Sequence, residues 1–232
     1  TALAASPPLF FTPSPQHFMD LLFMAILIAS GTYMLNAKEQ RKRIAILGMH
    51  LSHYQIEKLM EALTEGYMRA LGESSAERRD QVWSLLSTTE QQLSEQFSRF
   101  AADFAKVSEE DARVSRLPIA LPFADKLFPA ATFDMRKALA IHAKGITHVM
   151  QNTGHLSAKD RAYMMTAELF LMQHTCHWFC RSRAVASARL LRRHQTSHEQ
   201  VLAAVSHTLQ PAGLSPLQSM QPGRGEGRVL VL

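Results

Sequence analysis

The chain has little cysteine and no recognisable catalytic or nucleotide-binding motif. Its 232 residues include only two cysteines, Cys176 and Cys180, and a bridge between residues four apart would close a very small loop that constrains little. A reducing compartment is therefore the simpler interpretation. The glycines are mostly isolated, which argues against a phosphate-binding loop, and neither a G-x-S-x-G elbow nor an H-E-x-x-H sequence occurs. We expect a protein that is not an enzyme and has no cofactor.

Alternating strand patterns are also missing. The final VLVL comes nearest to a strand and is too short to count. Apolar residues at helical spacing, in contrast, recur along much of the chain. We therefore predict an all-α protein in which an N-terminal transmembrane helix continues into a helical hairpin or bundle domain.

Formal charge is nearly absent from residues 18–35, where Asp20 is the single charged side chain. Eighteen residues at about 1.5 Å per residue give roughly 27 Å of helix, close to the ~30 Å hydrocarbon core of a bilayer. We expect this segment to be a membrane anchor. The alternative is a buried core helix, because the uncharged stretch is short for a span. The apolar side chains predicted to contact lipid are Phe18, Leu21, Leu22, Phe23, Ile26, Leu27, Ile28 and Leu35.

Basic residues lie on only one side of this apolar segment. Lys38, Arg41, Lys42 and Arg43 follow it, and no charged residue precedes Phe18. The positive-inside rule then predicts an outside N-terminus and a C-terminal domain on the cytoplasmic face. A cleavable signal carries a basic region before its apolar segment, so we expect this anchor to be retained. The net charge of +5 suits anionic lipid, nucleic acid or an acidic protein, without choosing among them.

Proline placement divides the chain into six predicted segments. Prolines favour an extended arm at the start and interrupt the region after residue 107. No proline occurs between Pro15 and Leu71, so we expect the anchor to continue directly into the next helix. The predicted segments are an extended arm (1–14), a transmembrane anchor (15–37), a long αα-hairpin (38–107), a proline-rich apolar linker (108–131), C-terminal helices (132–209) and a tail (210–232).

Two apolar stripes of helical period predict the hairpin. The stripes consist of Met49, Ile56, Met60, Leu63 and Tyr67 in the first helix and of Leu93, Phe97, Phe100 and Phe104 in the second. Between them Gly72 supplies a helix end, and Ser74 with Glu77 reads as a capping box for the second helix. We predict that the two stripes pack against each other.

Capping residues predict three further helices in the C-terminal part. These helices start and end at Thr132 and Gln151, at Ser157 and His194, and at Ser197 and Leu209. Residues 163–180 are apolar enough to suggest a second span, but they include Glu168, and a carboxylate inside a bilayer costs several kcal/mol by some scales. We expect a buried helix there.

Thiol and imidazole side chains, which are zinc ligands, gather in one short stretch. The cluster consists of His174, Cys176, His177 and Cys180, and the nearest further candidates are His50 and His53. On a helix the four clustered residues spread over roughly 160° of the circumference, so one ion would engage only two of them. We favour two thiols in the core with histidines at its edge, and predict no metal. A metal-binding bundle is kept as an alternative.

Four arginines fall on one face of the predicted helix that ends at His194. Arg181, Arg189, Arg192 and Arg193 project at about 0°, 80°, 20° and 120°. Such a face binds phosphates, anionic headgroups or an acidic protein surface. For the last two arginines, a solvated helix end that complements the dipole is an equal alternative. No aromatic or amide side chains alternate with the arginines, which argues against nucleic acid recognition.

Three functions follow as hypotheses. The first is a non-enzymatic single-pass membrane protein, acting as scaffold or accessory subunit of a larger membrane complex, with other subunits and the lipid bilayer as partners. The second is a membrane-tethered binder of nucleic acid or anionic lipid through the arginine-rich face. The third is a metal-binding helical bundle with a redox or sensory role.

Overall fold

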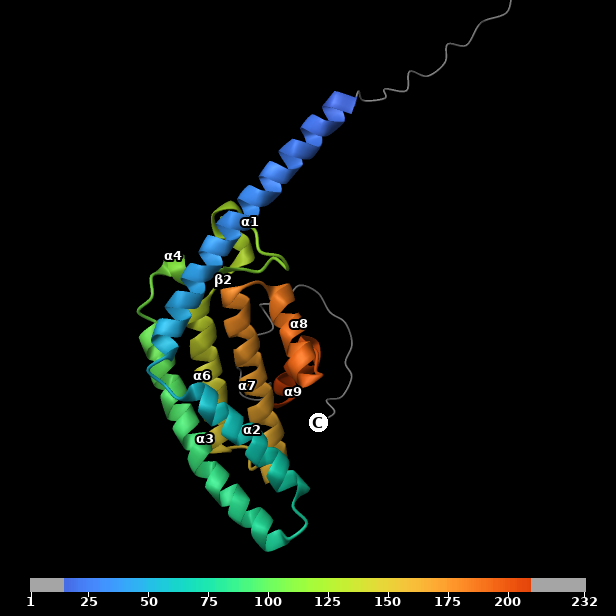
Figure 1. Cartoon of the computed structure of the whole chain (residues 1–232). Helices are drawn as coiled ribbons and strands as arrows, with labels where there is room; N and C mark the ends of the chain where they lie inside the picture. The colour runs from blue at the N-terminus through green and yellow to red at the C-terminus, as the bar shows by residue number, and fades with distance from the viewer. Residues whose placement is uncertain (1–14, 210–232) are drawn as a thin grey trace, which may run out of the picture.

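The computed structural model describes residues 15–209, and most of them are helical (Figure 1). The predicted arm (1–14) and tail (210–232) lie outside the described residues. In chain order the elements are α1 (Pro15–Leu51), α2 (Ile56–Gly72), α3 (Ala76–Phe104), α4 (Glu109–Ala112), β1 (Arg113–Ser115), α5 (Ala124–Leu127), the 3₁₀ turn η1 (Pro129–Ala131), β2 (Thr132–Asp134), α6 (Met135–Gln151), α7 (Ala158–Cys180), α8 (Arg183–His194) and α9 (His198–Leu209).

Helix α1 has two halves with different surroundings. Its N-terminal half projects from the bundle, and its C-terminal half packs on α3 and α7 (Figure 1). The expected continuation beyond residue 51 is wrong, because residues 52–55 form a turn. There the Tyr54 hydroxyl donates to Asp103, and the Gln55 N–H donates to Gln96 Oε1 at 2.7 Å. Both acceptors lie on α3, so contacts from a distant segment satisfy polar groups at the break.

Helices α2 and α3 form the core of the predicted hairpin, which therefore begins at α2 rather than at residue 38. With one exception the predicted stripe residues are buried in a common core, namely Ile56, Met60, Leu63, Tyr67, Leu93, Phe97, Phe100 and Phe104. The exception is Met49, which is 61% exposed, because it lies before the turn on α1, where Leu47 faces the core instead. The capping box is also wrong: Ser75 is the N-cap, and its N–H donates to the Glu73 carboxylate at 3.0 Å.

The mostly helical fold is as predicted, and a short β-ribbon is added to it. Strands β1 and β2 pair antiparallel, with Val114 opposite Phe133. Each strand has three residues, too few for an alternating pattern to be recognised. Because residues 132–134 are extended, Asp134 rather than Thr132 caps α6 and accepts from the Arg136 N–H at 2.9 Å. Trp178 holds the ribbon, since its ring packs edge-to-face on the ring of Phe133 with the centroids 4.9 Å apart.

The long helix predicted from Ser157 to His194 is two helices. Helix α7 ends at Cys180, and Ser182 begins α8 by accepting from the Val185 N–H at 3.4 Å. Helix α7 is buried around most of its circumference, as expected for a core helix over residues 163–180. Helices α8 and α9 pack on its outer face and enclose a second, smaller cluster, made of Ala167, Phe170, Leu171, Leu190, Val201, Leu202 and Val205.

Candidate functional site

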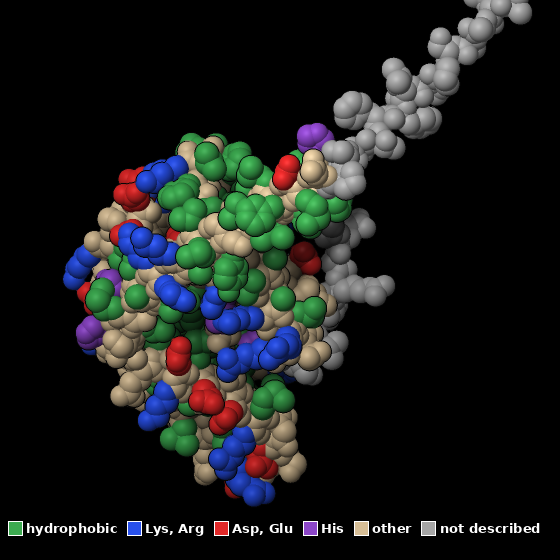
Figure 2. All heavy atoms as spheres, turned by 45° about the horizontal axis from the view of Figure 1, so that its top comes forward, with side chains coloured by type: hydrophobic (Ala, Val, Ile, Leu, Met, Phe, Trp, Pro, Cys, Tyr) green, Lys and Arg blue, Asp and Glu red, His purple; other side chains and the backbone are tan. Residues whose placement is uncertain are grey.

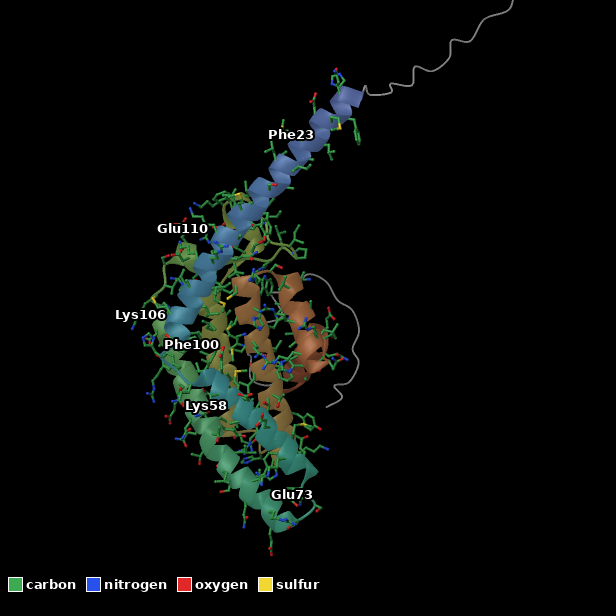
Figure 3. All side chains as sticks on the ribbon, viewed as in Figure 1. Phe23, Lys58, Glu73, Phe100, Lys106 and Glu110 are labelled. Carbon is green, nitrogen blue, oxygen red and sulfur yellow. The ribbon has the colours of Figure 1, made fainter. Side chains whose placement is uncertain are left out.

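The projecting half of α1 carries a long apolar surface that the described part of the protein leaves uncovered. Its side chains project from every side of the helix and are not covered by the bundle. Phe23, labelled in Figure 3, is one of them. Helix α1 is long and apolar enough to cross a membrane, and none of its most apolar stretch is buried. An uncovered apolar surface of this extent marks a contact with a membrane or a protein. All predicted anchor residues are exposed, namely Phe18, Leu21, Leu22, Phe23, Ile26, Leu27, Ile28 and Leu35.

The end of this apolar surface is tied to the domain by polar contacts. Asn36, directly after Leu35, donates from Nδ2 to the carbonyl oxygen of Ala120 at 3.0 Å. One turn further, Gln40 Oε1 accepts from Arg181 Nη1 at 2.6 Å. These bonds join α1 to two segments that are far away in sequence. The helix therefore enters the domain within about one turn of its last exposed leucine.

A small cleft opens at the same junction. It is lined by polar groups of α1, including Asn36 and Gln40, and by Leu121, Trp178 and Arg181 from the domain. Its volume of about 30 Å³ is on the scale of a water molecule. Pockets for small-molecule ligands are roughly ten times larger or more. The junction is thus suited to fixing the helix rather than to binding a substrate.

Residues 117–128 form an apolar segment beside this junction. The predicted linker does pack on α1, through the bond from Asn36 to Ala120. Its large side chains nevertheless face outward. Figure 2 shows hydrophobic side chains gathered over α1 and around its base, with lysines and arginines next to them. The exposed large residues of the segment are Ile119, Leu121, Phe123, Leu127 and Phe128.

A buried imidazole and carboxylate face each other between α6 and α7. His142 Nδ1 lies 3.5 Å from Glu168 Oε2, and both side chains are 1% exposed. Thr175 donates its single hydroxyl proton to the Leu171 carbonyl at 3.0 Å, so it accepts from His142 Nε2 at 2.9 Å. The proton of a neutral ring is therefore on Nε2, and Nδ1 is an acceptor. Two acceptors facing each other repel, so the pair needs one shared proton.

Glycine creates the space for this pair. A Cβ at Gly145 would lie 2.6 Å from Glu168 Oε1, closer than a Cβ approaches a non-bonded atom. Among the described residues, neither oxygen of Glu168 has a hydrogen-bond partner. Buried polar groups are normally satisfied, so this pair is held in place by packing rather than by a full network.

A second buried carboxylate, Glu90, is fully engaged. It accepts from the Tyr67 hydroxyl at 2.6 Å and pairs with Arg161 at 3.4 Å. Burial, and then the charge of Glu90, raises the pKa of Tyr67 above its usual value, so the phenol stays protonated and donates. This cluster joins α2, α3 and α7 and has a structural role.

Histidines also hold α8 and α9 against α7. The rings of His174 and His198 stack with centroids 4.0 Å apart, and His174 Nε2 lies 3.1 Å from the Ser187 hydroxyl. Burial lowers the pKa of His174 to about 2 and that of His198 to about 4. Both rings are therefore neutral at physiological pH and act as packing groups.

The candidate metal ligands are not assembled into a site. Among the described residues, no three side chains of His, Cys, Asp or Glu are placed to hold an ion. Burial raises the pKa of Cys176 to about 12 and that of Cys180 to about 11, so neither is a thiolate. His50 bonds to the Ile46 carbonyl, and His53 is exposed in the turn after α1. His177 lies 3.2 Å from Arg189.

The predicted four-arginine face of one helix is wrong, because the break at residue 182 separates its members. Arg181 lies at the end of α7 and bonds to Gln40 on α1. Arg189, Arg192 and Arg193 stay together on α8 and are exposed. Among the described residues, no carboxylate pairs with these three. They form the α8 arginine patch.

The buried pair and the outward-facing segment were not predicted as sites. Glu168 was recognised only as an obstacle to a second span. His142 had a detectable signal, because it lies three residues after Leu139 and three before Gly145 on the apolar face of α6. The exposure of residues 117–128 had no detectable signal in the sequence, because an apolar sequence interrupted by prolines is equally compatible with a covered linker.

Comparison with known proteins finds no match: no protein-family model, no curated protein and no solved structure is similar to this chain. Its function is therefore inferred from the geometry described above.

Proposed function

We propose that this chain is a non-enzymatic, single-pass membrane protein whose helical domain is a scaffold or accessory subunit of a larger membrane complex. The observation that carries the proposal is the two-part character of α1. Over its apolar half the helix is uncovered, and after Asn36 the same helix is built into the core up to Leu47. An unbroken helix with this pattern is typical of an anchor that holds a domain in a defined orientation.

Charge placement supports an orientation for this anchor. Lys38 and Arg41 are exposed directly after the apolar half, while Lys42 pairs with Asp111 of α4. The basic residues therefore belong to the face from which the domain extends. By the positive-inside rule the domain lies on the cytoplasmic or equivalent side, and the N-terminus on the other.

The α8 arginine patch is the proposed contact with an acidic partner subunit or anionic headgroups. Exposed guanidinium groups form bidentate, charge-assisted bonds to carboxylates and phosphates. The α8 residues around them are mostly Ala, Ser, Val and Leu, which offers no group to read base edges. This favours a protein or lipid surface over nucleic acid.

The anchor is tested by carbonate extraction of membranes that contain the full chain. We expect the wild type to stay in the pellet, and the double variant Leu27→Arg and Ile28→Arg to be released, because each charge at the centre of a span costs about 2.5–3.5 kcal/mol. Leu85→Arg is the matched control, since Leu85 is also an exposed large apolar residue but lies on α3. Release of the wild type would refute the anchor.

The role in a complex is tested on membranes dissolved in a mild detergent. We expect other membrane proteins to co-purify with the full chain in fixed ratio, and this association to persist in the Leu85→Arg control. Recovery of the chain alone, in a detergent that preserves known complexes of the same membrane, would contradict a scaffold role. Protease cleavage of the domain from the N-terminal side would contradict the orientation.

A further inference from the structure

We propose that residues 117–128 are a second membrane contact, whose apolar side chains enter the bilayer interface beside α1. This inference rests on the proposed function, because its reference point is an anchored α1. It adds a lipid-binding surface on the domain itself, so that the domain lies against the membrane and does not hang from a single helix.

One hydrogen bond fixes the position of the segment along the axis of α1, which is called its level below. Asn36 donates to the carbonyl oxygen of Ala120, and Asn36 is the residue directly after Leu35, the last large apolar residue of the projecting half. Ile119 and Leu121 flank Ala120 and are both exposed. The centre of the segment therefore lies at the level where the apolar surface of α1 ends, which is the boundary between hydrocarbon and headgroups.

The basic residues on α1 agree with this level. At about 1.5 Å per residue, Lys38 and Arg41 lie roughly 4–9 Å beyond Leu35 along the helix. The headgroup region of one leaflet is about 5–8 Å thick. Both cations are exposed and thus fall among the headgroups, with the apolar segment just below them toward the hydrocarbon.

At Phe123 an unusual backbone conformation accompanies an outward-facing side chain. Phe123 has a φ of 58°, a left-handed conformation that is strained for an aromatic residue, and it starts the short helix α5. Phe123 is 52% exposed and Leu127, one turn later, is 66% exposed. Lys126 between them is exposed and pairs with Glu110 at 3.1 Å. Phenylalanine and leucine beside a lysine are typical of surfaces that lie in the membrane interface.

Lipid is a better occupant of this surface than a water-soluble protein. The exposed residues of the segment are continuous with those of α1 through the contact between Asn36 and Ala120, so both surfaces share one environment. A soluble partner would have to cover the segment at a level where α1 is already surrounded by lipid. A bilayer covers both at once.

The test uses the full chain in vesicles of phosphatidylcholine with a minor fraction of phosphatidylglycerol. Single cysteines replace Phe123, Leu127, Ile28 or Leu85, and each carries a nitroxide label. The native chain, whose cysteines Cys176 and Cys180 are only partly buried, is labelled in parallel, and its signal is subtracted as the background. Collision with oxygen, which concentrates in lipid, is compared with collision with a water-soluble nickel complex.

We expect the labels at positions 123 and 127 to collide with oxygen in several-fold preference to nickel, relative to the label at position 85. Labels at 123 and 127 that behave like the one at 85 would overturn the proposal. Labels shielded from both reagents would also overturn it, in favour of a protein interface. The label at position 28 reports on the anchor alone: if it is in lipid while 123 is in water, the membrane anchor stands and the second contact does not.

Discussion

The carboxylate of Glu168 and the imidazole of His142 face each other at 3.5 Å between α6 and α7, and both are almost completely buried. The ring donates through Nε2 to Thr175, so its other nitrogen needs a proton between it and Glu168. Among the described residues neither Nδ1 nor either oxygen of Glu168 has a hydrogen-bond partner, so the contact at 3.5 Å is the polar contact that the two groups share. Removal of one partner leaves a lone polar group in an apolar interior.

The pair predicts non-additive effects of substitution. Replacing His142 with Leu leaves Glu168 buried without its partner, and we expect a loss of about 3–5 kcal/mol in the free energy of unfolding. The double variant His142→Leu and Glu168→Leu is expected to lose less, because no uncompensated group remains. The single variant Glu168→Leu completes the double-mutant cycle, and urea unfolding of the full chain in detergent, followed by circular dichroism, measures all four proteins. Simple additivity of the two single losses would contradict the pairing.

Gly145 is expected to be intolerant of even a methyl group. Its substitution by Ala would put a Cβ 2.6 Å from the Glu168 carboxylate, and we expect a loss of about 1–3 kcal/mol from overpacking. Gly48→Ala is the control, since no atom lies within 4 Å of a Cβ there and alanine favours a helix by up to about 1 kcal/mol. Equal effects of the two substitutions on the unfolding midpoint would refute the close approach.

Acidification is expected to weaken the packing of α8 and α9 on α7. An unfolded histidine takes up a proton near pH 6.5, whereas burial lowers the pKa of His198 to about 4 and that of His174 to about 2. Below pH 6.5 the unfolded state therefore binds more protons, and stability falls as the pH drops toward 4. His198 alone contributes a loss on the order of 3 kcal/mol by pH 4.

Urea unfolding at pH 7.5, 5.5 and 4.5 measures this dependence. The change between pH 7.5 and 5.5 reports on histidine, because carboxylates such as Asp111 and Asp134, whose pKa is lowered in the folded state, begin to cost stability only as the pH falls below about 5. The variant His198→Gln should reduce the slope of the profile above pH 4.5, while His174 keeps its own contribution. A stability that stays constant from pH 7.5 to 4.5 would rule out the neutral buried rings.

The hairpin core predicts a large cost for Phe100→Ala. Phe100 is fully buried and contacts Phe97 and Phe104 through ring pairs at 5.6 and 6.0 Å. Truncation of such a side chain costs about 3–5 kcal/mol. Leu85→Ala, at an exposed position of the same helix, should change the stability by less than about 0.5 kcal/mol. The thermal unfolding midpoints of the two variants are compared with that of the wild-type full chain. An unchanged midpoint for Phe100→Ala would contradict the packing.

The long periodic helices were predictable, because apolar residues at helical spacing, such as Leu93, Phe97 and Phe100, indicate a helix with one buried face. The helix breaks were not. Residues 52–55 include neither proline nor glycine, and the break is stabilised by Asp103 and Gln96 of α3, which no local pattern reveals. Ser182 did carry a local signal, since serine favours an N-cap, but the apolar spacing continues across it.

The candidate sites divide in the same way. Composition left two outcomes for the anchor residues, a membrane anchor or a buried core helix, and the exposure of these residues excludes burial within the described part of the domain. The partner of Arg181 depends on the tertiary structure, because Gln40 comes 141 residues earlier. For the same reason the arginine face shrinks to the three residues that share α8.

The α8 arginine patch predicts a charge-dependent contact with an acidic partner surface. The double variant Arg189→Glu and Arg193→Glu places two carboxylates on the same face of α8, and we expect it to detach co-purifying subunits while the helical content stays unchanged. Arg192 is left in place to retain one cation near the C-terminus of α8, where it complements the dipole. Lys58→Glu with Arg79→Glu changes the net charge equally on α2 and α3 and should leave the association intact.

Salt separates this contact from apolar association. At 1 M ionic strength the Debye length falls to about 3 Å, so exposed ion pairs are screened, and the wild type should then lose the same subunits as the double variant. Loss of binding in the Lys58 and Arg79 control as well would indicate a response to net charge and contradict a defined patch. A salt-resistant, sequence-selective complex of the full chain with an oligonucleotide would instead make α8 a nucleic acid reader, since phosphate contacts alone weaken steeply with salt and do not select sequence.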